Sequence, residues 1–153
     1  MAAFLKSLPA TAQQGAFAYR DSPANELQSG KPQQPGAAVY LGFCAPCHRI
    51  DGKGQAPFMP PLAGNPAVLD ANPSSLINLV LNGAEPLVAK GIPDAYRMPQ
   101  YRIQLNDEEI AQTLSFVRRG WGNDAAPVAT DEVKKLRPVT DPSSDRVIIL
   151  KMR

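Results

Sequence analysis

The chain has very few side chains that bind metals or carry redox chemistry: one histidine and two cysteines in 153 residues. It has no uninterrupted apolar run of roughly 18 residues, so no segment is predicted to cross a membrane as a helix. The net charge is only +2, and no basic stripe is interleaved with aromatic residues, so a nucleic-acid partner is not expected. The single histidine excludes any site that needs two imidazoles from one chain.

Aromatic residues make up only 7% of the chain, whereas proline, with 16 residues, stands at about twice its usual share of roughly 5%. Apolar residues reach 44%, which is enough for one core in a chain of this length. Frequent prolines interrupt long helices and sheets. The composition therefore predicts a mainly α-helical domain in which short helices are joined by stiff loops.

Two helices are predicted in the first half of the chain. One covers residues 35–47, with Pro35 at its first position. The other starts at Asn72-Pro73, with Asn72 as its cap, and ends before Gly83. The apolar face of this second helix is predicted to consist of Leu76, Leu79 and Val80.

A third helix has the clearest signals. Asn106 and Glu109 form a capping box at its start, and Gly120 ends it. Arg118 and Arg119 lie in its last turn, where positive charges interact favourably with the negative end of the helix dipole. Its buried face is predicted to consist of Ile110, Leu114 and Val117.

Both cysteines and the histidine fall within five positions, as Cys44, Cys47 and His48. Cys-x-x-Cys-His is the attachment signature of haem c. Two thiols about one helical turn apart can add to the two vinyl groups on one edge of a porphyrin, and the next residue then brings its imidazole to the iron. The pattern predicts one covalent haem c, with Cys44 and Cys47 as thioethers and His48 as an iron ligand.

Three other interpretations stay open on the motif alone. A thioredoxin-like redox pair needs a βαβ context, which a helix followed by a Gly/Pro loop does not offer. A structural zinc site needs four ligands, and no second Cys or His pair exists in the chain. A Cys-His nucleophile is disfavoured because neighbouring residues rarely present a nucleophile and its base to one substrate atom.

The second axial ligand is predicted to be Met98. The carbonyl of Pro60 suits the other ring nitrogen of His48, which places Met59 on the histidine side of the ring. Met98 lies far enough along the chain to reach the opposite face, and Pro99 restricts it to an extended conformation. Met59 and an open or water-bound position remain as alternatives.

Four stretches, in order and spacing, resemble class I cytochromes c: GAAVYLGFCAPCH, PPLAGNP, YRMPQY and LNDEEIAQTLSFVRRGWGN. The resemblance implies that family's fold, with the first helix crossing the last around one haem, and supports Pro60 and Met98 in their roles. The residues it brings together are Gly36 and Tyr40 on the first helix and Leu114, Phe116 and Val117 on the last. A finer resemblance is to haem domains in multi-haem cytochrome c subunits of periplasmic, membrane-associated dehydrogenases for alcohol, gluconate or aldehyde.

Three regions are expected: a linker or the end of a preceding domain over residues 1–34, the haem domain over 35–124, and a C-terminal tail over 125–153. The start of the chain, MAAFLKSLP, resembles the end of another haem domain, so the chain is expected to be the last such domain of a longer protein. Residues 147–150 form an apolar strip predicted to dock on the domain. Arg49 stands where many relatives have glycine, and both a haem-propionate contact and a solvated side chain are open, with the second favoured.

The expected function is one-electron transfer from a dehydrogenase to a downstream acceptor, not catalysis. The partners are redox proteins: a dehydrogenase subunit, another cytochrome, a quinone site or an oxidase. Contact residues at the haem edge are predicted to be Ala45, Pro46, Phe58 and Met59. Because bacteria attach haem to this motif outside the cytoplasm, the resemblance implies the periplasm. The alternative is a haem enzyme or small-ligand sensor with an open sixth position.

Overall fold

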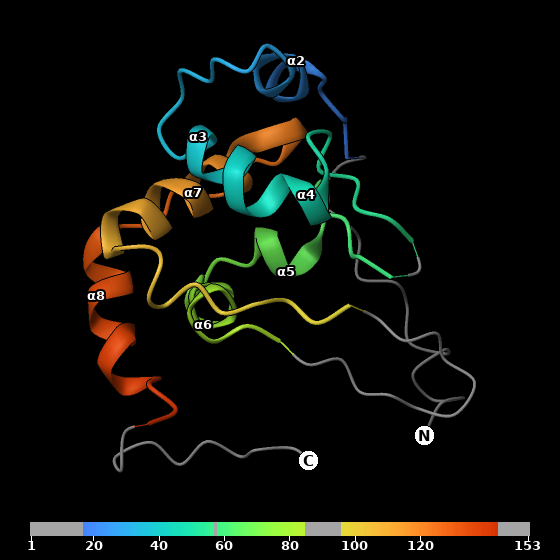
Figure 1. Cartoon of the computed structure of the whole chain (residues 1–153). Helices are drawn as coiled ribbons and strands as arrows, with labels where there is room; N and C mark the ends of the chain where they lie inside the picture. The colour runs from blue at the N-terminus through green and yellow to red at the C-terminus, as the bar shows by residue number, and fades with distance from the viewer. Residues whose placement is uncertain (1–16, 57, 85–95, 144–153) are drawn as a thin grey trace, which may run out of the picture.

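Helices provide the regular structure of the chain, described here from a computed structural model over residues 17–56, 58–84 and 96–143 (Figure 1). In chain order the elements are α2 (Ser22–Gln28), α3 (Ala37–Val39), the π-helix η1 (Tyr40–Cys44), α4 (Ala45–His48), α5 (Pro66–Leu69), α6 (Ser74–Asn82), α7 (Asp107–Arg119), the 3-10 helix η2 (Gly120–Gly122) and α8 (Thr130–Val139). Within the described residues, β-type pairing is limited to two isolated bridges, Gln55–Met59 and Ala84–Met98. The predicted mainly α-helical class is confirmed. No helix in this part of the chain is long and apolar enough to cross a membrane.

Helix α7 is the centre of the core and contacts α3, α5, α6 and α8. Its capping box is present in full: the Asn106 side chain accepts a hydrogen bond from the Glu109 N–H (2.9 Å), and the Glu109 carboxylate accepts one from the Asn106 N–H (2.8 Å). The predicted apolar face of Ile110, Leu114 and Val117 is buried. Sequence signals therefore located the start, the end and the buried face of this helix.

Arg118, in the last turn of α7, is buried with an exposed fraction of only 1%. Its guanidinium donates to the carbonyl oxygens of Val68 (2.7 Å), Asp70 (2.8 Å) and Ala126 (2.7 Å). These bonds replace the water lost on burial and join α7 to α5 and to the chain that leads into α8. Arg118 thus has a structural role beyond the dipole effect predicted for it.

The helix predicted over residues 35–47 is present as a continuous run of α3, η1 and α4. It begins after Gly36, whose φ of 80° is left-handed and whose Cβ position lies 2.3 Å from the backbone of Gln112 in α7. Further along, the Tyr40 ring packs on Phe116 and Trp121 at centroid distances of 5.4 and 5.2 Å. The crossing of the first and last helices implied by the family resemblance is confirmed.

Helix α6 lies where it was predicted, but its buried face differs. The Asn72 side chain accepts a hydrogen bond from the Ser74 N–H (3.0 Å), so the helix proper starts at Ser74, and Gly83 follows its end. The buried residues are Leu76, Ile77 and Leu81, whereas Leu79 is 36% exposed. The predicted face of Leu76, Leu79 and Val80 was therefore rotated, because α6 packs against both α7 and α8 rather than against one neighbour.

Helix α2 lies within residues 1–34, which were expected to be a linker or the end of a preceding domain. It covers Ser22–Gln28, and Leu27 is 1% exposed. Before it, the Arg20 N–H donates to the carbonyl of Trp121 (3.0 Å), and the Cβ position of Gly122 lies 2.0 Å from the Ala18 carbonyl oxygen. Residues 17–28 are therefore packed on the C-terminal end of α7. Only Pro23 and Leu27 are buried in this seven-residue helix, which is too few positions for a clear apolar pattern in the sequence.

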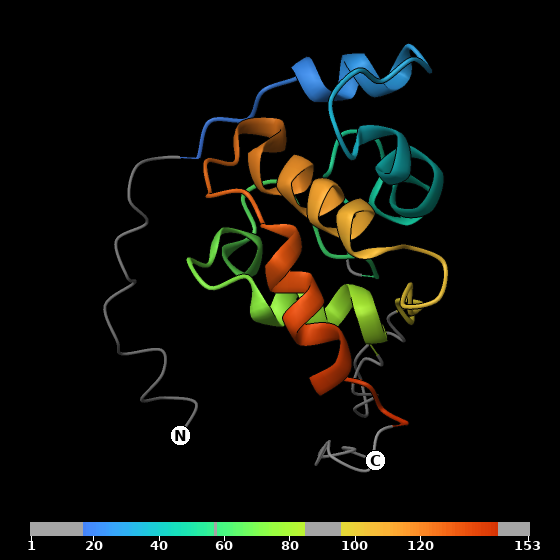
Figure 2. The same ribbon diagram turned by 90° about the vertical axis from the view of Figure 1, so that its left-hand side faces the viewer.

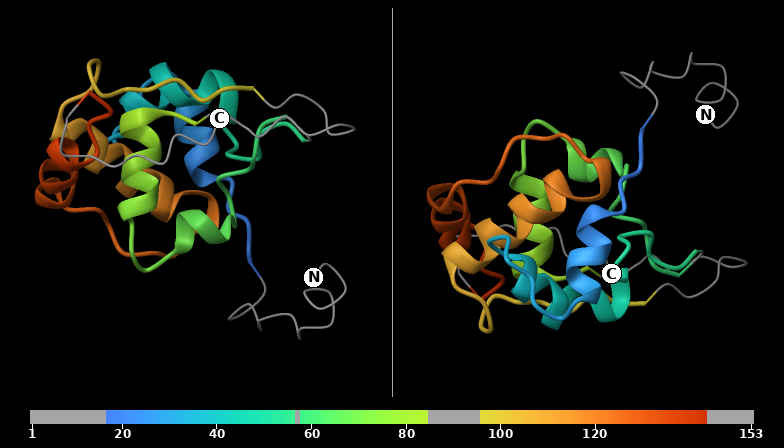
Figure 3. Two further views of the ribbon diagram at one scale, coloured as in Figure 1. Left: turned by 90° about the horizontal axis from the view of Figure 1, so that it is seen from below. Right: turned by 90° about the horizontal axis from the view of Figure 1, so that it is seen from above.

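Helix α8 lies within residues 125–153, which were expected to form a C-terminal tail. It covers Thr130–Val139, and Val128 and Val133 are buried beneath it. It lies beside α7 and across α6 (Figure 2), on the other side of the core from α2 (Figure 3). The apolar strip at residues 147–150 lies outside the described residues.

Candidate haem site

The two cysteines and the histidine lie on one short stretch of helix. Cys44 ends η1, and Cys47 and His48 lie in α4. Both thiols are free; Cys47 is exposed and Cys44 is partly buried. Burial, with a smaller contribution from Cys47, raises the pKa of the Cys44 thiol to about 12. A thiol that stays protonated at neutral pH is a poor nucleophile, which disfavours Cys44 as the attacking thiol of a redox pair.

The His48 imidazole faces the loop that follows the motif. Its Nδ1 lies 3.3 Å from the carbonyl oxygen of Pro60, which can only accept a hydrogen bond, so Nδ1 carries the proton. Burial lowers the pKa of His48, and the Pro60 carbonyl opposes this effect more weakly. A neutral ring protonated on Nδ1 leaves a lone pair on Nε2, as an axial metal ligand requires. Pro60 lies where the sequence argument placed it.

The chain directly after His48, residues 49–54, is here called the motif loop. Three consecutive backbone carbonyls of this loop each accept a hydrogen bond from an aromatic side chain far away in sequence or in another element. The pairs are Arg49 with the Tyr40 hydroxyl (2.7 Å), Ile50 with the Trp121 Nε1–H (2.9 Å) and Asp51 with the Tyr19 hydroxyl (2.9 Å). These three bonds fix the path of the loop and, with it, the orientation of the histidine. Trp121 and Tyr19 were not predicted as partners of the motif loop, because no nearby sequence pattern indicates hydrogen bonds that span 71 and 32 residues.

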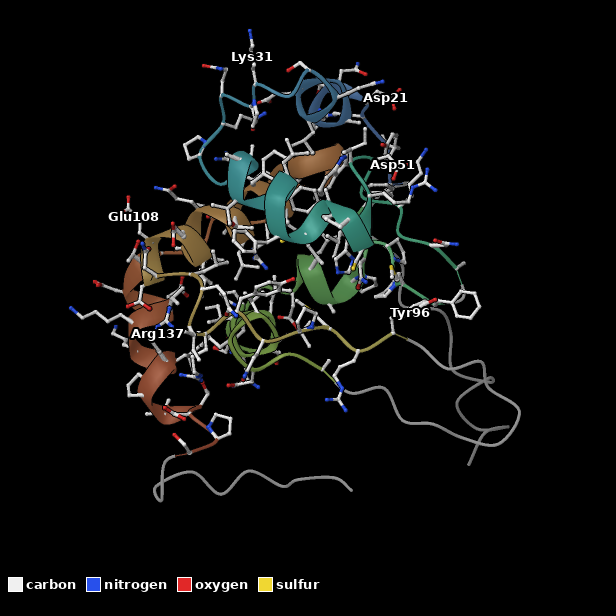
Figure 4. All side chains as sticks on the ribbon, in the orientation of Figure 1. Asp21, Lys31, Asp51, Tyr96, Glu108 and Arg137 are labelled. Atoms are coloured by element: carbon white, nitrogen blue, oxygen red, sulfur yellow. The ribbon has the colours of Figure 1, made fainter. Side chains whose placement is uncertain are left out.

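Arg49 has a left-handed backbone, with φ of 65°, which is uncommon for a residue other than glycine. Glycine adopts this conformation without strain, and at Arg49 the Tyr40 hydroxyl bond to the carbonyl helps to hold it. The guanidinium pairs with the Asp51 carboxylate at 3.1 Å, and the side chain is 58% exposed. Arg49 is thus exposed and ion-paired (Figure 4 labels Asp51), and a contact with a propionate stays a prediction.

Residues 96–102, here called the Met98 segment, run from the end of α6 toward the motif helix. Met98 is partly buried and exchanges two backbone hydrogen bonds with Ala84 (3.1 and 3.0 Å). Further along, Tyr101 donates its N–H to the Val80 carbonyl (3.0 Å) and its hydroxyl to the Phe43 carbonyl (2.8 Å). The segment is therefore tied to α6 at one point and to the residue before Cys44 at another.

Met59 lies on the same loop as Pro60. It forms the second isolated bridge, with Gln55, through two backbone hydrogen bonds of 2.9 and 2.8 Å. The loop that presents the Pro60 carbonyl to His48 thus carries Met59 with it. This arrangement supports the sequence argument that Met59 belongs to the histidine side.

Partly exposed aromatic rings surround this region. Phe43 and Phe58 are 41% and 36% exposed, and their rings lie 5.8 Å from Tyr101 and 6.0 Å from Tyr96. Figure 4 labels Tyr96, at the start of the described part of the Met98 segment. Of these four residues, only Phe58 was predicted as a surface contact. Another predicted contact, Ala45, is instead buried, because its methyl group packs in the core.

These residues fit a covalently attached haem. Two free thiols lie about one helical turn apart, a neutral imidazole follows with Nε2 available, and exposed apolar rings lie close by. Among the described residues, no group of three or more His, Cys, Asp or Glu side chains is arranged to hold a metal ion, so zinc has no second pair of ligands here. The donor set is that of an iron porphyrin.

Comparisons with known proteins point the same way. Residues 33–121 match the cytochrome c family model. The chain is 43% identical, over 147 residues, to the cytochrome c subunit of the quinone alcohol dehydrogenase of Gluconacetobacter polyoxogenes, covering 94% of this chain and 31% of that subunit. It is 39% identical, over 140 residues, to the gluconate 2-dehydrogenase cytochrome c subunit of Pantoea cypripedii, covering 90% of this chain and 32% of that subunit. Cytochrome c-552 of Thermus thermophilus is 36% identical over 114 residues, which are 69% of this chain and 86% of that protein.

The chain spans about a third of the length of the dehydrogenase subunits that it matches. The matched family region contains Cys44, Cys47, His48 and Met98 and ends at the aromatic anchor Trp121. Both helices that the sequence did not predict, α2 and α8, lie outside it. Membership of this family implies covalent haem c and electron transfer rather than catalysis by the chain itself. On its fold, its motif and its relatives, the chain belongs to the cytochrome c family.

Proposed function

We propose that this chain is a one-electron carrier with a single haem c, whose iron is held by His48 and Met98. The observation that carries the proposal is the orientation of His48: its Nδ1 is engaged by the Pro60 carbonyl at 3.3 Å, which leaves Nε2 for iron. The sequence has no second histidine, so a second imidazole of this chain does not fill the other axial position. Met98 lies on a segment that is bonded to the residue preceding Cys44 through Tyr101.

Each residue has a defined part in this proposal. Cys44 and Cys47 bind the porphyrin covalently, and Pro60 orients His48. When bound, the haem supplies a reversible one-electron couple, and a methionine ligand favours a higher potential than a second histidine. Met98 keeps small ligands such as dioxygen from the iron by filling the sixth position. Two cysteines provide for one haem, which agrees with a single redox centre in the chain.

We propose further that the carrier serves a membrane-associated dehydrogenase complex in the periplasm. The support is the similarity to cytochrome c subunits of quinone-dependent alcohol dehydrogenase and of gluconate dehydrogenase. The chain would be one haem domain of a multi-haem subunit that passes electrons to another cytochrome, a quinone site or an oxidase. The contact surface is the rim of exposed residues near the motif, including Phe58 and Pro46.

The test is absorption spectroscopy of the protein produced together with the machinery that attaches haem c. A pyridine haemochrome of haem c type is expected, together with the weak far-red band of methionine-ligated ferric haem. Met98→Ala is expected to abolish that band, whereas Met59→Ala, the matched control, is expected to leave it unchanged. Haem c without a far-red band in the unaltered protein, together with carbon monoxide binding, would favour an enzyme or sensor with an open sixth position.

A further inference from the structure

The C-terminal end of α8 contacts the chain on both sides of the Ala84–Met98 bridge. Asn82, the last residue of α6, donates from its side chain to the Thr140 carbonyl (2.9 Å). Arg102, four residues after Met98, donates to the Arg137 carbonyl (2.6 Å) and to the Thr140 hydroxyl (3.1 Å). The end of α8 therefore bonds to the end of α6, which precedes the bridge, and to the Met98 segment, which follows it.

The two arginines bind each other's backbone. The Arg102 guanidinium donates to the Arg137 carbonyl, and the Arg137 guanidinium donates to the Arg102 carbonyl, both at 2.6 Å. Arg102 also donates to the Asn82 side-chain oxygen through Nε (3.2 Å) and Nη2 (2.9 Å). Each arginine thus uses its fork of donors to bind two or more oxygens, which lysine cannot reproduce.

Arg137 extends this contact to the start of α7. It forms an ion pair with Asp107 at 2.5 Å and donates to the Leu105 carbonyl at 2.9 Å. Both members of the ion pair are mostly buried, with 23% and 26% of their side chains exposed, so solvent screens the pair less than a surface pair. Figure 4 shows Arg137 on α8, beside the chain that leads into α7.

The bridge itself is a weak restraint on Met98. It consists of one pair of backbone hydrogen bonds, each of which contributes only about 1 kcal/mol net. For the bridge to open, Ala84 and Met98 must separate. Asn82, two residues before Ala84, and Arg102, four residues after Met98, are held together by a direct side-chain hydrogen bond, and both also bond to Thr140. The arginine contacts therefore resist the motion that would carry Met98 away from the motif.

We propose that α8 acts as a latch on the Met98 segment, with Arg102 and Arg137 as positioning residues that keep Met98 on the iron. This inference rests on the proposed ligation by Met98. Helix α8 lies outside the region that matches the cytochrome c family model, residues 33–121. It adds a restraint on the Met98 segment beyond the bridge and the two Tyr101 hydrogen bonds.

The test compares haem-loaded full-length protein with its Arg137→Gln variant. Imidazole competes with methionine for ferric iron, so its dissociation constant reports how readily Met98 leaves. In Arg137→Gln, imidazole is expected to bind about 10-fold more tightly. The reason is that the substitution removes charged hydrogen bonds of Arg137, and the loss of one such bond corresponds to about a tenfold change in an equilibrium constant. The far-red band is also expected to disappear at a lower temperature than the helical circular dichroism signal. Lys135→Gln, on the exposed side of α8, is the matched control and is expected to change neither readout.

A purely structural role gives a different result. If Arg137→Gln lowers the temperature of global unfolding but leaves imidazole affinity as it is in Lys135→Gln, the latch is refuted. If Arg137→Gln does not yield folded protein, Thr140→Val is used instead, because it removes one acceptor of Arg102. In this variant imidazole is expected to bind about threefold more tightly than in the unaltered protein. Failure of the ligation itself is distinguished by Met98→Ala: an unchanged far-red band in that variant refutes Met98 as the ligand, whatever the latch variants do.

Discussion

The two sides of the proposed haem site are held in different ways. On the histidine side, the motif loop is fixed by three aromatic donors, and two of them, Tyr40 and Trp121, are fully buried. On the methionine side, the Met98 segment is held by one backbone bridge, by Tyr101 and by a partly exposed network of arginines. The first set of restraints belongs to the core, and the second belongs to the surface of the domain.

This difference predicts different kinds of failure. The motif loop cannot loosen unless Tyr40 or Trp121 leaves the core, so histidine ligation and global folding should be lost together. The Met98 segment can separate while the core stays intact, because local openings require only the contacts that cover them to break. Ligand exchange at the iron is therefore expected to take place on the methionine side.

The largest expected effect is that of Gly36→Ala on the histidine side. A Cβ there would lie 2.3 Å from the Gln112 backbone at φ of 80°, so the crossing of α3 and α7 would have to open. We expect a loss of about 3 kcal/mol or more in the free energy of unfolding, measured by denaturant titration. Gly42→Ala is the control, since no atom lies within 4 Å of its Cβ position and its φ is not left-handed. Equal stability of the two variants would contradict the packing described here.

Trp121→Phe removes one anchor of the motif loop and keeps an aromatic ring in the core. The Ile50 carbonyl then loses its donor, and a loss of about 2 kcal/mol in the free energy of unfolding is expected. Thermal loss of the far-red band and of helical circular dichroism should still coincide. Tyr19→Phe, at a partly exposed anchor, should cost less, about 1 kcal/mol. Separation of the two transitions in Trp121→Phe would show that the histidine side also opens locally.

Gly83→Ala tests the methionine side. Its Cβ would lie 2.4 Å from the Met98 carbonyl oxygen at φ of 73°, so the bridge has to shift. We expect the far-red band to weaken and to disappear well below the temperature of global unfolding. Gly30→Ala is a matched control, because it has a similar φ of 70° but no atom within 4 Å of its Cβ position. If Gly83→Ala lowers the temperature of global unfolding and the far-red band is lost only at that same temperature, the methionine side does not open separately from the core.

The smallest expected effect is that of Glu26→Gln, far from both ligands. Hydrogen bonds from Gln34, and more weakly from Gln33, lower the pKa of the Glu26 carboxyl from 4.5. A lowered pKa in the folded state adds stability that is fully present above 4.5 and is lost as the pH falls through the folded-state pKa. The stability difference between the variant and the unaltered protein should therefore be small at neutral pH and vanish in acid, with the far-red band unchanged in both.

Local signals were sufficient for much of this fold. The capping box of α7, the glycine after α6 and the clustering of Cys44, Cys47 and His48 each depend on residues close together in sequence. The His48–Pro60 contact was also within reach, because it spans only 12 residues of a stiff loop. Features that depend on residues close together in the sequence, such as helix ends and the haem motif, could therefore be predicted from the sequence alone.

Long-range and sparsely buried features were not predictable in this way. Trp121 donates to a carbonyl 71 residues away, and no local pattern marks that pairing. The buried residues are Pro23 and Leu27 in α2 and Val133 in α8, which are too few for a clear helical pattern in the sequence. The arginine network depends on where α8 docks, and α8 docks according to the shape left by α6 and α7.

The π-helix η1 sets the direction of the first cysteine. In an α-helix, positions four apart share a face, so the residue four after Tyr40 would point into the core as Tyr40 does. In η1 the Ala45 N–H bonds to the Tyr40 carbonyl, and the buried positions become Ala37, Tyr40 and Ala45, with exposed fractions of 0%, 0% and 9%. The one extra residue in the turn places the Ala45 methyl group against the core and leaves Cys44, the residue before it, only partly buried at the edge of the core. Deleting one residue between 41 and 43 would put Ala45 four positions after Tyr40, so an ordinary α-helix would then keep the same two residues against the core without the π-turn.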